Sequence, residues 1–498
     1  RARPLRLDRP ADLAPAFLRM GLPTPARDYL LEKLPLVHVL LTGLEREQGR
    51  FLAGLFAGGE DPGREVFPGW VAGDQRTRPG TGLLSGRREQ FAHLVERARE
   101  RPELAGLADA LARVEAAARP LAPLVLGPRT LVFGERTHVL GVVNVTPDSF
   151  SDGGRYLDSE AAIAHGLRLA EAGADVLDLG AESTRPGAPP VSADEQLARL
   201  VPVLAGLRAR TDVPLSVDTT RAAVAREALA AGAVLINDIS GGSFEPRLLQ
   251  EVAEAGAALC LMHIQGTPET MQRAPHYEDV VDEVLGFLEE RVAQAVEAGV
   301  ARERLLVDPG IGFGKTLGHN VFLLRRLGEL RVLGLPVLVG TSRKGFLGTL
   351  TGGRPVEQRL AATLGSVAAL AAVGDADVLR VHDVAEARDA LAVADAVVDQ
   401  VGQHLLEAQR VADQRQRRVA IDQADQLQLL GMRRRCEDGQ GVLDQVAQVP
   451  AELPERRPLD DRVDERPPRH GASAGRIGTD RDRTAATARM PATADAFT

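Results

Sequence analysis

The sequence is poor in several residue types, and each shortage narrows the class of protein. Only two of the 498 residues are cysteine, which excludes a disulfide framework and favours a reducing compartment such as the cytoplasm. No apolar run reaches the roughly eighteen residues of a membrane span, and the chain shows no signal-peptide pattern. The formal net charge of -9 gives no reason to expect a nucleic-acid partner.

Lysine and asparagine are almost absent. The 60 basic residues include only three lysines, Lys33, Lys315 and Lys344. Such a bias is typical of a GC-rich coding sequence in which arginine replaces lysine wherever either residue serves. A lysine that persists is therefore either chance or a position that needs a compact ammonium group. The polar neighbours of Lys344 favour the second explanation there.

A pattern of strand followed by helix repeats eight times between about residues 138 and 402. Apolar runs that alternate with amphipathic stretches such as 159–172, 193–208 and 220–231 indicate a buried parallel sheet. Eight cycles favour a closed (β/α)8 TIM barrel over an open doubly wound sheet. The predicted strands are His138–Asn144, Asp175–Gly180, Pro214–Asp218, Val234–Asp238, Ala258–His263, Arg304–Asp308, Pro336–Gly340 and Asp377–His382.

Two further segments flank the predicted barrel domain, which we place at 136–405. Residues 1–125 predict a small α/β or α+β accessory domain of unknown role, with no catalytic spacing of His, Cys and carboxylates. Residues 406–498 are a low-complexity tail rich in Arg, Asp and Gln. Two hypotheses fit the tail, namely a disordered segment and the product of a frameshift.

Polar residues follow all eight predicted strands. In a TIM barrel these strand ends meet at one mouth, where the active site lies. A purely structural barrel would not need them, because each buried polar group left unpaired costs on the order of 1–3 kcal/mol. The strand ends include Asn144, Glu182, Asp218, Asn237–Asp238, His263, Asp308, Thr341–Lys344 and Arg380–Asp383.

These segments resemble the signatures of the dihydropteroate synthase family, in that family's order, over about residues 136–402. Asn-Val-Thr-Pro-Asp-Ser-Phe at 144–150 and Ser-Thr-Arg-Pro-Gly at 183–187 are its specific blocks. The resemblance implies a cytoplasmic, Mg²⁺-dependent transferase that joins a dihydropterin diphosphate to p-aminobenzoate. It also implies a homodimer, with small-molecule substrates and neither a nucleic-acid nor a membrane partner.

A pterin ring presents adjacent N–H donors that a carboxylate accepts in bidentate fashion. Asp308 is the best candidate acceptor, and the resemblance implies that Asp218 and Asn237 complete the edge. Each residue also has a structural explanation. Asp308 could cap the turn that follows it, Asn237 could bond to backbone at the strand end, and Asp218 could cap a helix at Thr219 or Thr220.

The diphosphate needs cationic donors and Mg²⁺. Asn144 would give the metal one oxygen ligand and leave the rest to phosphate and water. Arg380 and His382 lie two apart on one strand, so their side chains point the same way and can donate to phosphate oxygens. The alternative is a barrel-lining pair satisfied by neighbouring carboxylates. His263 is assigned no role.

The remaining candidates surround the p-aminobenzoate. Lys344 is expected over the pterin, Ser342 at the aminobenzoate carboxylate, and Phe313 either against its ring or in the core. Arg343 is equally consistent with a surface ion pair. The predicted catalytic residues are Lys344, Asp308, Arg380 and His382. Further predicted substrate contacts are Thr184, Arg185, Pro186, Met262 and Gly312.

Other functions fit the sequence less well. A pterin-binding methyltransferase that serves a corrinoid has no use for the Thr-Arg-Pro-Gly loop or for Arg380 and His382. A non-catalytic pterin-binding protein would not need the complete set of charged residues. Residues 310–316 do not form a phosphate-binding loop, because position 309 is proline where that motif requires glycine.

Overall fold

The computed structural model describes residues 2–5, 37–56, 69–72, 80–86, 88–117, 119–145, 154–183, 187 and 190–397. All of them belong to the first of the two units into which the chain divides, Arg1–Val411. The predicted tail at 406–498 and the predicted contacts Thr184, Arg185 and Pro186 lie outside these ranges. Within them, no helix combines the length and the apolar character that crossing a membrane requires.

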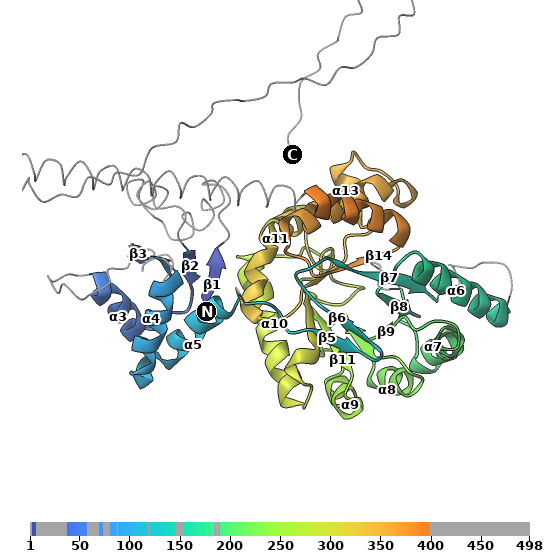
Figure 1. Cartoon of the computed structure of the whole chain (residues 1–498), viewed down its shortest axis with the longest axis horizontal. Helices are drawn as coiled ribbons and strands as arrows, with labels where there is room; N and C mark the ends of the chain where they lie inside the picture. Colours follow the sequence, from blue (N-terminus) through green and yellow to red (C-terminus); the bar gives the residue numbers. More distant parts are fainter. Residues whose placement is uncertain are drawn as a thin grey trace, which may run out of the picture. The chain divides into compact units, whose positions relative to one another are not determined.

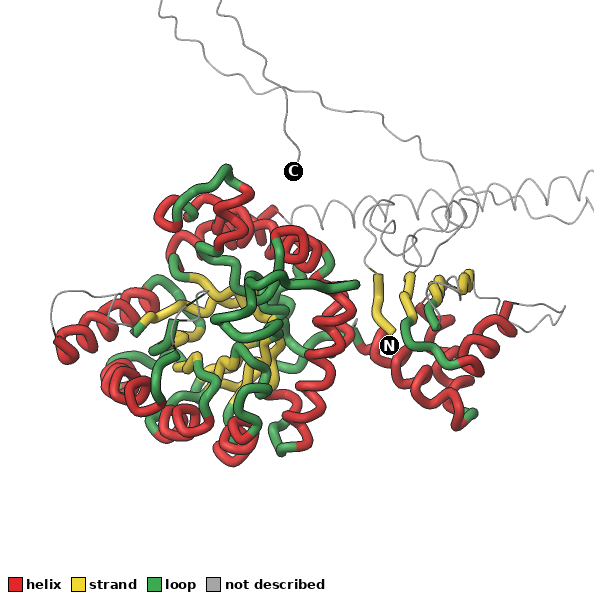
Figure 2. Tube along the Cα trace, turned by 180° about the vertical axis from the view of Figure 1, so that it is seen from behind, coloured by secondary structure: helices red, strands yellow, loops and turns green. Residues whose placement is uncertain are grey.

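Eight parallel strands form the closed barrel that the sequence predicts (Figure 2). They are hydrogen-bonded in the order β12-β11-β10-β9-β8-β7-β14-β13. A parallel bridge between Val307 and Val337 joins the two ends, with the Val307 N–H donating to the Pro336 carbonyl at 3.0 Å. The strands are β7 (His138–Asn144), β8 (Val176–Gly180), β9 (Leu215–Asp218), β10 (Leu235–Asp238), β11 (Ala258–Met262), β12 (Leu305–Asp308), β13 (Leu338–Val339) and β14 (Val378–Val381).

Helices surround the strands and cover the outer face of the barrel (Figure 1). Side-chain caps fix where three of them begin: Ser192 accepts from the Glu195 N–H, Asp279 from the Val281 N–H, and Thr316 from the His319 N–H. The helices are α6 (Gly154–Glu171), α7 (Ala193–Arg208), α8 (Ala222–Ala230), α9 (Arg247–Ala255), α10 (Val280–Glu297), α11 (Leu317–Arg325), α12 (Gly345–Leu350) and α13 (Leu360–Val373), followed by helical residues 384–397.

A hairpin missed by the sequence analysis closes the amino end of the barrel. Its strands are β5 (Leu124–Leu126) and β6 (Arg129–Leu131). Leu124, Leu126 and Leu131 are buried in one apolar cluster with side chains from the first residues of the barrel strands. The hairpin therefore seals the end of the barrel opposite to the mouth. The cluster also includes Phe133, Leu140, Val176, Leu235, Ala258, Cys260, Leu306, Leu338 and Val378.

The amino-terminal residues form the small α/β appendage that the sequence predicts. Its antiparallel sheet runs β1-β2-β4-β3, and buried His38 and Ser85 from neighbouring strands are bonded at 2.7 Å. Gly82 has no room for a side chain, because a Cβ there would lie 2.0 Å from the Trp70 ring. The elements are β1 (Ala2–Leu5), β2 (Val37–Leu41), α3 (Arg46–Phe56), β3 (Gly69–Ala72), β4 (Gly82–Gly86), α4 (Arg88–Arg99) and α5 (Ala105–Ala116).

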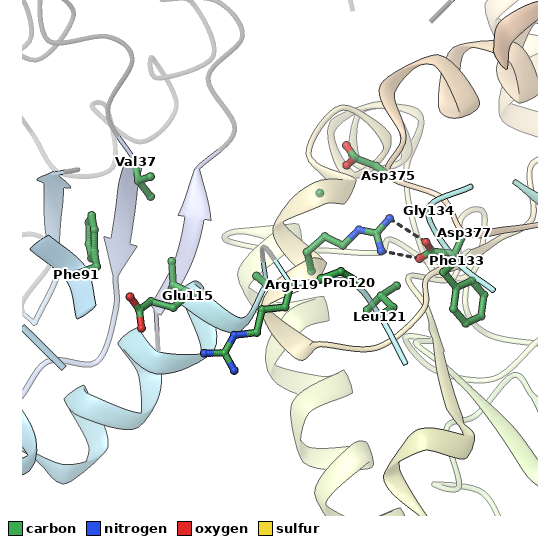
Figure 3. A pocket seen from close by; sticks show the side chains of 14 residues that line it. Val37, Phe91, Glu115, Arg119, Pro120, Leu121, Phe133, Gly134, Asp375 and Asp377 are labelled. Carbon is green, nitrogen blue, oxygen red and sulfur yellow. Dashed lines mark hydrogen bonds and ion pairs between the residues drawn. The ribbon is translucent and has the colours of Figure 1, made fainter. Parts of the chain in front are cut away.

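A cavity of about 590 Å³ lies at the amino end of β14 (Figure 3). Asp375 and Asp377, which precede that strand, line it together with Arg331 and residues of the 37–134 region. Arg331 forms an ion pair with Asp377 at 2.9 Å. Because parallel strands carry their active sites at the carboxyl ends, this cavity is at the wrong end of the barrel for catalysis.

Candidate active site at the carboxyl ends of the strands

Asp178 is the centre of the polar network in the barrel, and the sequence analysis did not select it. The fully buried carboxylate accepts from Ser216 Oγ at 2.6 Å, Asn237 Nδ2 at 3.2 Å and Arg380 Nε at 2.7 Å. A signal was present in the sequence, because Asp178 interrupts the apolar run of β8, Val-Leu-Asp-Leu-Gly. An acid inside a buried strand needs partners, and two of its three partners here, Asn237 and Arg380, are predicted site residues.

Asp218 is bound to Arg380 and does not cap a helix. Arg380 Nη2 donates to Asp218 Oδ2 at 3.0 Å. Helix α8 begins at Ala222, and Thr219 Oγ1 accepts the Arg221 N–H near its start, so the alternative of a helix cap is wrong. Burial raises the pKa of Asp218 to about 7 although Arg380 opposes the shift. Asp218 is the last residue of β9, at the mouth of the barrel.

Arg380 is the cation that joins these carboxylates. Its guanidinium bridges Asp178 and Asp218, whose charges hold the pKa of Arg380 above its ordinary value although burial opposes them. The predicted alternative of a lining residue satisfied by carboxylates is thus met in this structure. Arg380 is the third residue of β14 (Val378–Val381), and His382 follows the end of that strand.

Asp308 both caps a turn and lines the mouth. Its Oδ1 accepts the Gly310 N–H at 2.7 Å, so the predicted capping role is confirmed. Burial raises the pKa of Asp308, and the charge of Lys344 opposes the shift. Asn237 donates to the Asp178 side chain, so the predicted bond to backbone is wrong for its amide nitrogen. Three predicted residues lie at the carboxyl ends of strands at this mouth. Asp218 and Asp308 are the last residues of β9 and β12, and Asn237 is the second-last residue of β10.

Lys344 lies over the loop that follows β12, together with the predicted residues Gly312 and Phe313. Its Nζ donates to the Ile311 carbonyl and lies 4.6 Å from the centroid of the Phe313 ring. Gly312 has φ +85°, and a Cβ there would approach Lys344 Cδ to 3.2 Å. Desolvation lowers the pKa of Lys344 to about 8, and Asp308 opposes the shift. Phe313 also packs on an apolar cluster that includes Met262.

Ser342 is bonded to His382. Ser342 Oγ accepts the His382 N–H at 3.2 Å and lies 3.0 Å from His382 Nδ1. The predicted diphosphate residue and the predicted aminobenzoate residue therefore support each other across β13 and β14. The side chain of Arg343 donates to Asp383, so the ion pair that the sequence left open is present.

His263 and Lys315 form a buried pair beneath the Asp308–Thr316 loop. Lys315 Nζ lies 2.8 Å from His263 Nδ1 and donates to the Phe313 carbonyl at 3.0 Å. Burial lowers the pKa of both side chains. Lys315 was not assigned a role from the sequence, although it was one of only three lysines. Its place under the loop gives it a supporting role.

Asn144 ends β7 at the same mouth and is half-buried. In the part of the chain that the structure describes, no group of three or more His, Cys, Asp or Glu side chains could hold a metal ion. The amide oxygen of Asn144 could contribute one ligand to Mg²⁺, which takes most of its shell from phosphate and water.

Comparison with known proteins agrees with this geometry. The model of the pterin binding enzyme family matches residues 140–382. A dihydropteroate synthase from Synechocystis sp. is 46% identical over 275 residues, which cover 55% of this chain and 95% of that protein. The Xanthomonas albilineans dihydropteroate synthase with 4-aminobenzoic acid is 51% identical, with a TM-score of 0.52 over 56% of this chain and 98% of that one. The same enzyme in complex with 7,8-dihydropteroate is 48% identical, with a TM-score of 0.50 over 55% and 98%.

Proposed function

Because this chain belongs to the dihydropteroate synthase family, we propose that its barrel condenses 6-hydroxymethyl-7,8-dihydropterin diphosphate with p-aminobenzoate. The products are 7,8-dihydropteroate and pyrophosphate. One observation carries the residue assignment. Buried acceptors at Asp218 and Asp308 lie at one barrel mouth with the cations Lys344 and Arg380. This arrangement suits a substrate that presents N–H donors at one end and negative charge at the other.

The pterin ring binds to the carboxylates deep in the mouth. Asp308 and Asp218 accept its N–H groups, and Asn237 is held against the same edge by its bond to Asp178. Burial disfavours the charged form of both acids, so a ligand that donates to them relieves an energetic cost. Lys344 is placed to donate to the ring carbonyl or a ring nitrogen, with Gly312 close beneath it.

The diphosphate leaves toward Arg380 and His382. These side chains donate to its oxygens, and Asn144 supplies an oxygen ligand to Mg²⁺, which would neutralise the departing charge. The C–O bond at the exocyclic methylene breaks and the electron pair leaves with the diphosphate. The arylamine of p-aminobenzoate forms the new C–N bond and then loses a proton. Catalysis is chiefly positioning and electrostatic stabilisation.

The p-aminobenzoate binds nearer the rim. Phe313 and Lys344 lie together on the loop side, with Met262 in the apolar cluster behind Phe313. Ser342 remains the proposed contact to the carboxylate, although it already bonds to His382. Thr184, Arg185 and Pro186 remain predicted contacts from outside the described residues.

The assembly and location of the protein are further proposals. The family resemblance implies a homodimer, which light scattering during size-exclusion chromatography would test. A cytoplasmic location is supported by the low cysteine content, with Cys260 buried and unpaired. Cell fractionation would test it.

A direct assay tests the reaction. Purified protein is mixed with Mg²⁺, the dihydropterin diphosphate and p-aminobenzoate, and pyrophosphate and dihydropteroate are followed together. Equal appearance of both products, dependent on p-aminobenzoate, is the expected result. Chelation of Mg²⁺ and the Asn144→Ala variant should each lower the rate. Intact pterin binding without turnover would instead indicate a binding protein on this scaffold.

A further inference from the structure

Arg343 has an unusual backbone conformation at a critical place. Its φ is +58°, in the left-handed region that glycine favours, and Ala274 is the other described non-glycine residue with positive φ. The Lys344 N–H donates to the Thr341 carbonyl at 3.2 Å, so Arg343 is the third residue of a four-residue turn. Glycine or asparagine usually occupies such a position. Ser342 and Lys344, both assigned to the substrate site, are its two neighbours.

The backbone of Arg343 is bonded on both sides to the start of α13. Its N–H donates to Thr363 Oγ1 at 3.0 Å, and its carbonyl accepts from Arg359 Nη1 at 3.0 Å. Thr363 is fully buried, and Arg359 immediately precedes the helix. The turn is therefore fastened to a rigid element and not only to its own strand.

The side chain of Arg343 makes a third attachment. Its guanidinium donates through Nε to Asp383 Oδ2 at 3.0 Å and through Nη2 to Asp383 Oδ1. This bidentate geometry is the form of ion pair that fixes orientation most strongly. Asp383 directly follows His382, which is itself bonded to Ser342. A glycine at position 343 would suit the backbone better but could not bind Asp383.

We propose that Arg343 is a positioning residue that holds Ser342, Lys344 and His382 in register for the reaction. The strained turn, attached to Thr363, Arg359 and Asp383, sets the direction in which Ser342 and Lys344 leave the backbone. The ion pair ties this turn to the end of β14, the strand that carries Arg380 and is followed by His382. The inference rests on the proposed function for its substrates but not for its geometry.

Three variants separate backbone strain from the ion pair. Arg343→Ala removes the ion pair and keeps the strain, Arg343→Gly removes both, and Asp383→Asn weakens the pair while the backbone is unchanged. The melting temperature of Arg343→Gly should be higher than that of Arg343→Ala, because glycine tolerates positive φ. Ala274→Gly is the matched control. Ala274 also has a positive φ, so this variant should gain stability, and because its side chain is exposed, the kinetics should not change.

Kinetics on the folded proteins then distinguish positioning from stability. All three variants should lower kcat/KM for p-aminobenzoate by roughly tenfold or more, because misplaced contacts weaken the reaction geometry. Arg343→Gly should remain defective although it is the more stable variant. Wild-type kcat/KM in Arg343→Ala, or full rescue by Arg343→Gly, would overturn the proposal.

Failure of the proposed function gives a different result. In that case the wild-type protein does not turn over, and calorimetric titration with p-aminobenzoate and the dihydropterin diphosphate replaces the rate assay. Weaker binding in Arg343→Ala and Arg343→Gly would then support the positioning role. Wild-type affinity in both would overturn it independently of the reaction.

Discussion

Two aspartates at opposite ends of the barrel, Asp175 and Asp218, are held in opposite ways. At the amino end, Asp175 accepts from Arg136 Nη2 at 2.6 Å, from the Val139 N–H at 2.7 Å and from Arg388. Burial alone would raise its pKa, but these donors and His138 hold the pKa well below its ordinary value. At the mouth, burial raises the pKa of Asp218 to about 7 despite Arg380.

The difference lies in how fully each carboxylate is satisfied by the protein. Asp175 has several donors from its own chain, so its charge stabilises the fold. Asp218 and Asp308 are buried with fewer donors, which is costly in the free protein and is offset when a ligand supplies the missing hydrogen bonds. We therefore interpret Asp175, which has several hydrogen-bond donors, as structural, and Asp218 and Asp308, which have fewer donors and lie at the mouth, as candidate ligand-binding groups.

The largest expected effect comes from breaking the mouth. Lys344→Met and Asp308→Asn should each lower kcat/KM by roughly 100- to 1,000-fold, because each removes a polar group aimed at the reacting substrate. Stability should stay the same or rise, since a poorly satisfied buried charge is lost in each case. Steady-state kinetics would measure the loss of kcat/KM, and urea unfolding would measure the stability. Near-normal turnover in either variant would remove that residue from the site.

Asp175→Asn should give the converse result at the amino end. Removing a buried charge that several donors hold should lower the free energy of unfolding by about 3 kcal/mol, while kcat/KM of the folded protein stays unchanged. The pKa of Asp175 is lowered in the folded state, so its contribution is present above the unfolded pKa of about 4 and is lost as pH falls. The stability gap between variant and wild type should therefore begin to close below about pH 4.

The pH dependence of kcat/KM offers a sharper test of the mouth. Asp218, whose pKa is raised to about 7, must be ionised to accept from the pterin, so kcat/KM should rise with pH through about 7. Lys344, whose pKa is lowered to about 8, must be protonated, so kcat/KM should fall above about 8. A narrow bell is expected. Lys344→Met should lose the alkaline limb, and a limb that persists belongs to another group.

The sequence was sufficient to predict the strands of the barrel, but not the hydrogen bonds between side chains of different strands. Strand and helix periodicity placed each barrel strand to within two residues, because parallel strands are continuous apolar runs. Asp178 was missed because nothing local shows that Ser216, Asn237 and Arg380 converge on it. Pairings between distant strands depend on register and tilt, which single-sequence patterns do not encode.

Other misses have the same cause. The hairpin at 124–131 was not predicted because its two short strands bury their apolar residues only against the barrel. The helix-cap alternative for Asp218 was locally reasonable, but Arg380 lies 162 residues away along the chain and takes the carboxylate. The motif resemblance identified the predicted substrate contacts. The residues that hold them in place, such as Asp178, are apparent only from the structure.

The smallest expected effect concerns Lys315, whose buried side chain lies beneath the loop that follows β12. Lys315→Met deletes the donor to the Phe313 carbonyl, so kcat/KM for p-aminobenzoate should fall by roughly fivefold, the loss of about one hydrogen bond. The charge of Lys315 also lowers the pKa of Asp308, so its removal should raise that pKa, which a carboxyl NMR titration of Asp308 would measure. Stability should change little, because a buried cation is exchanged for an apolar chain of similar length. An unchanged pKa of Asp308 would mean that Lys315 carries no charge in the folded protein and supports the loop by hydrogen bonding alone, as a neutral amine.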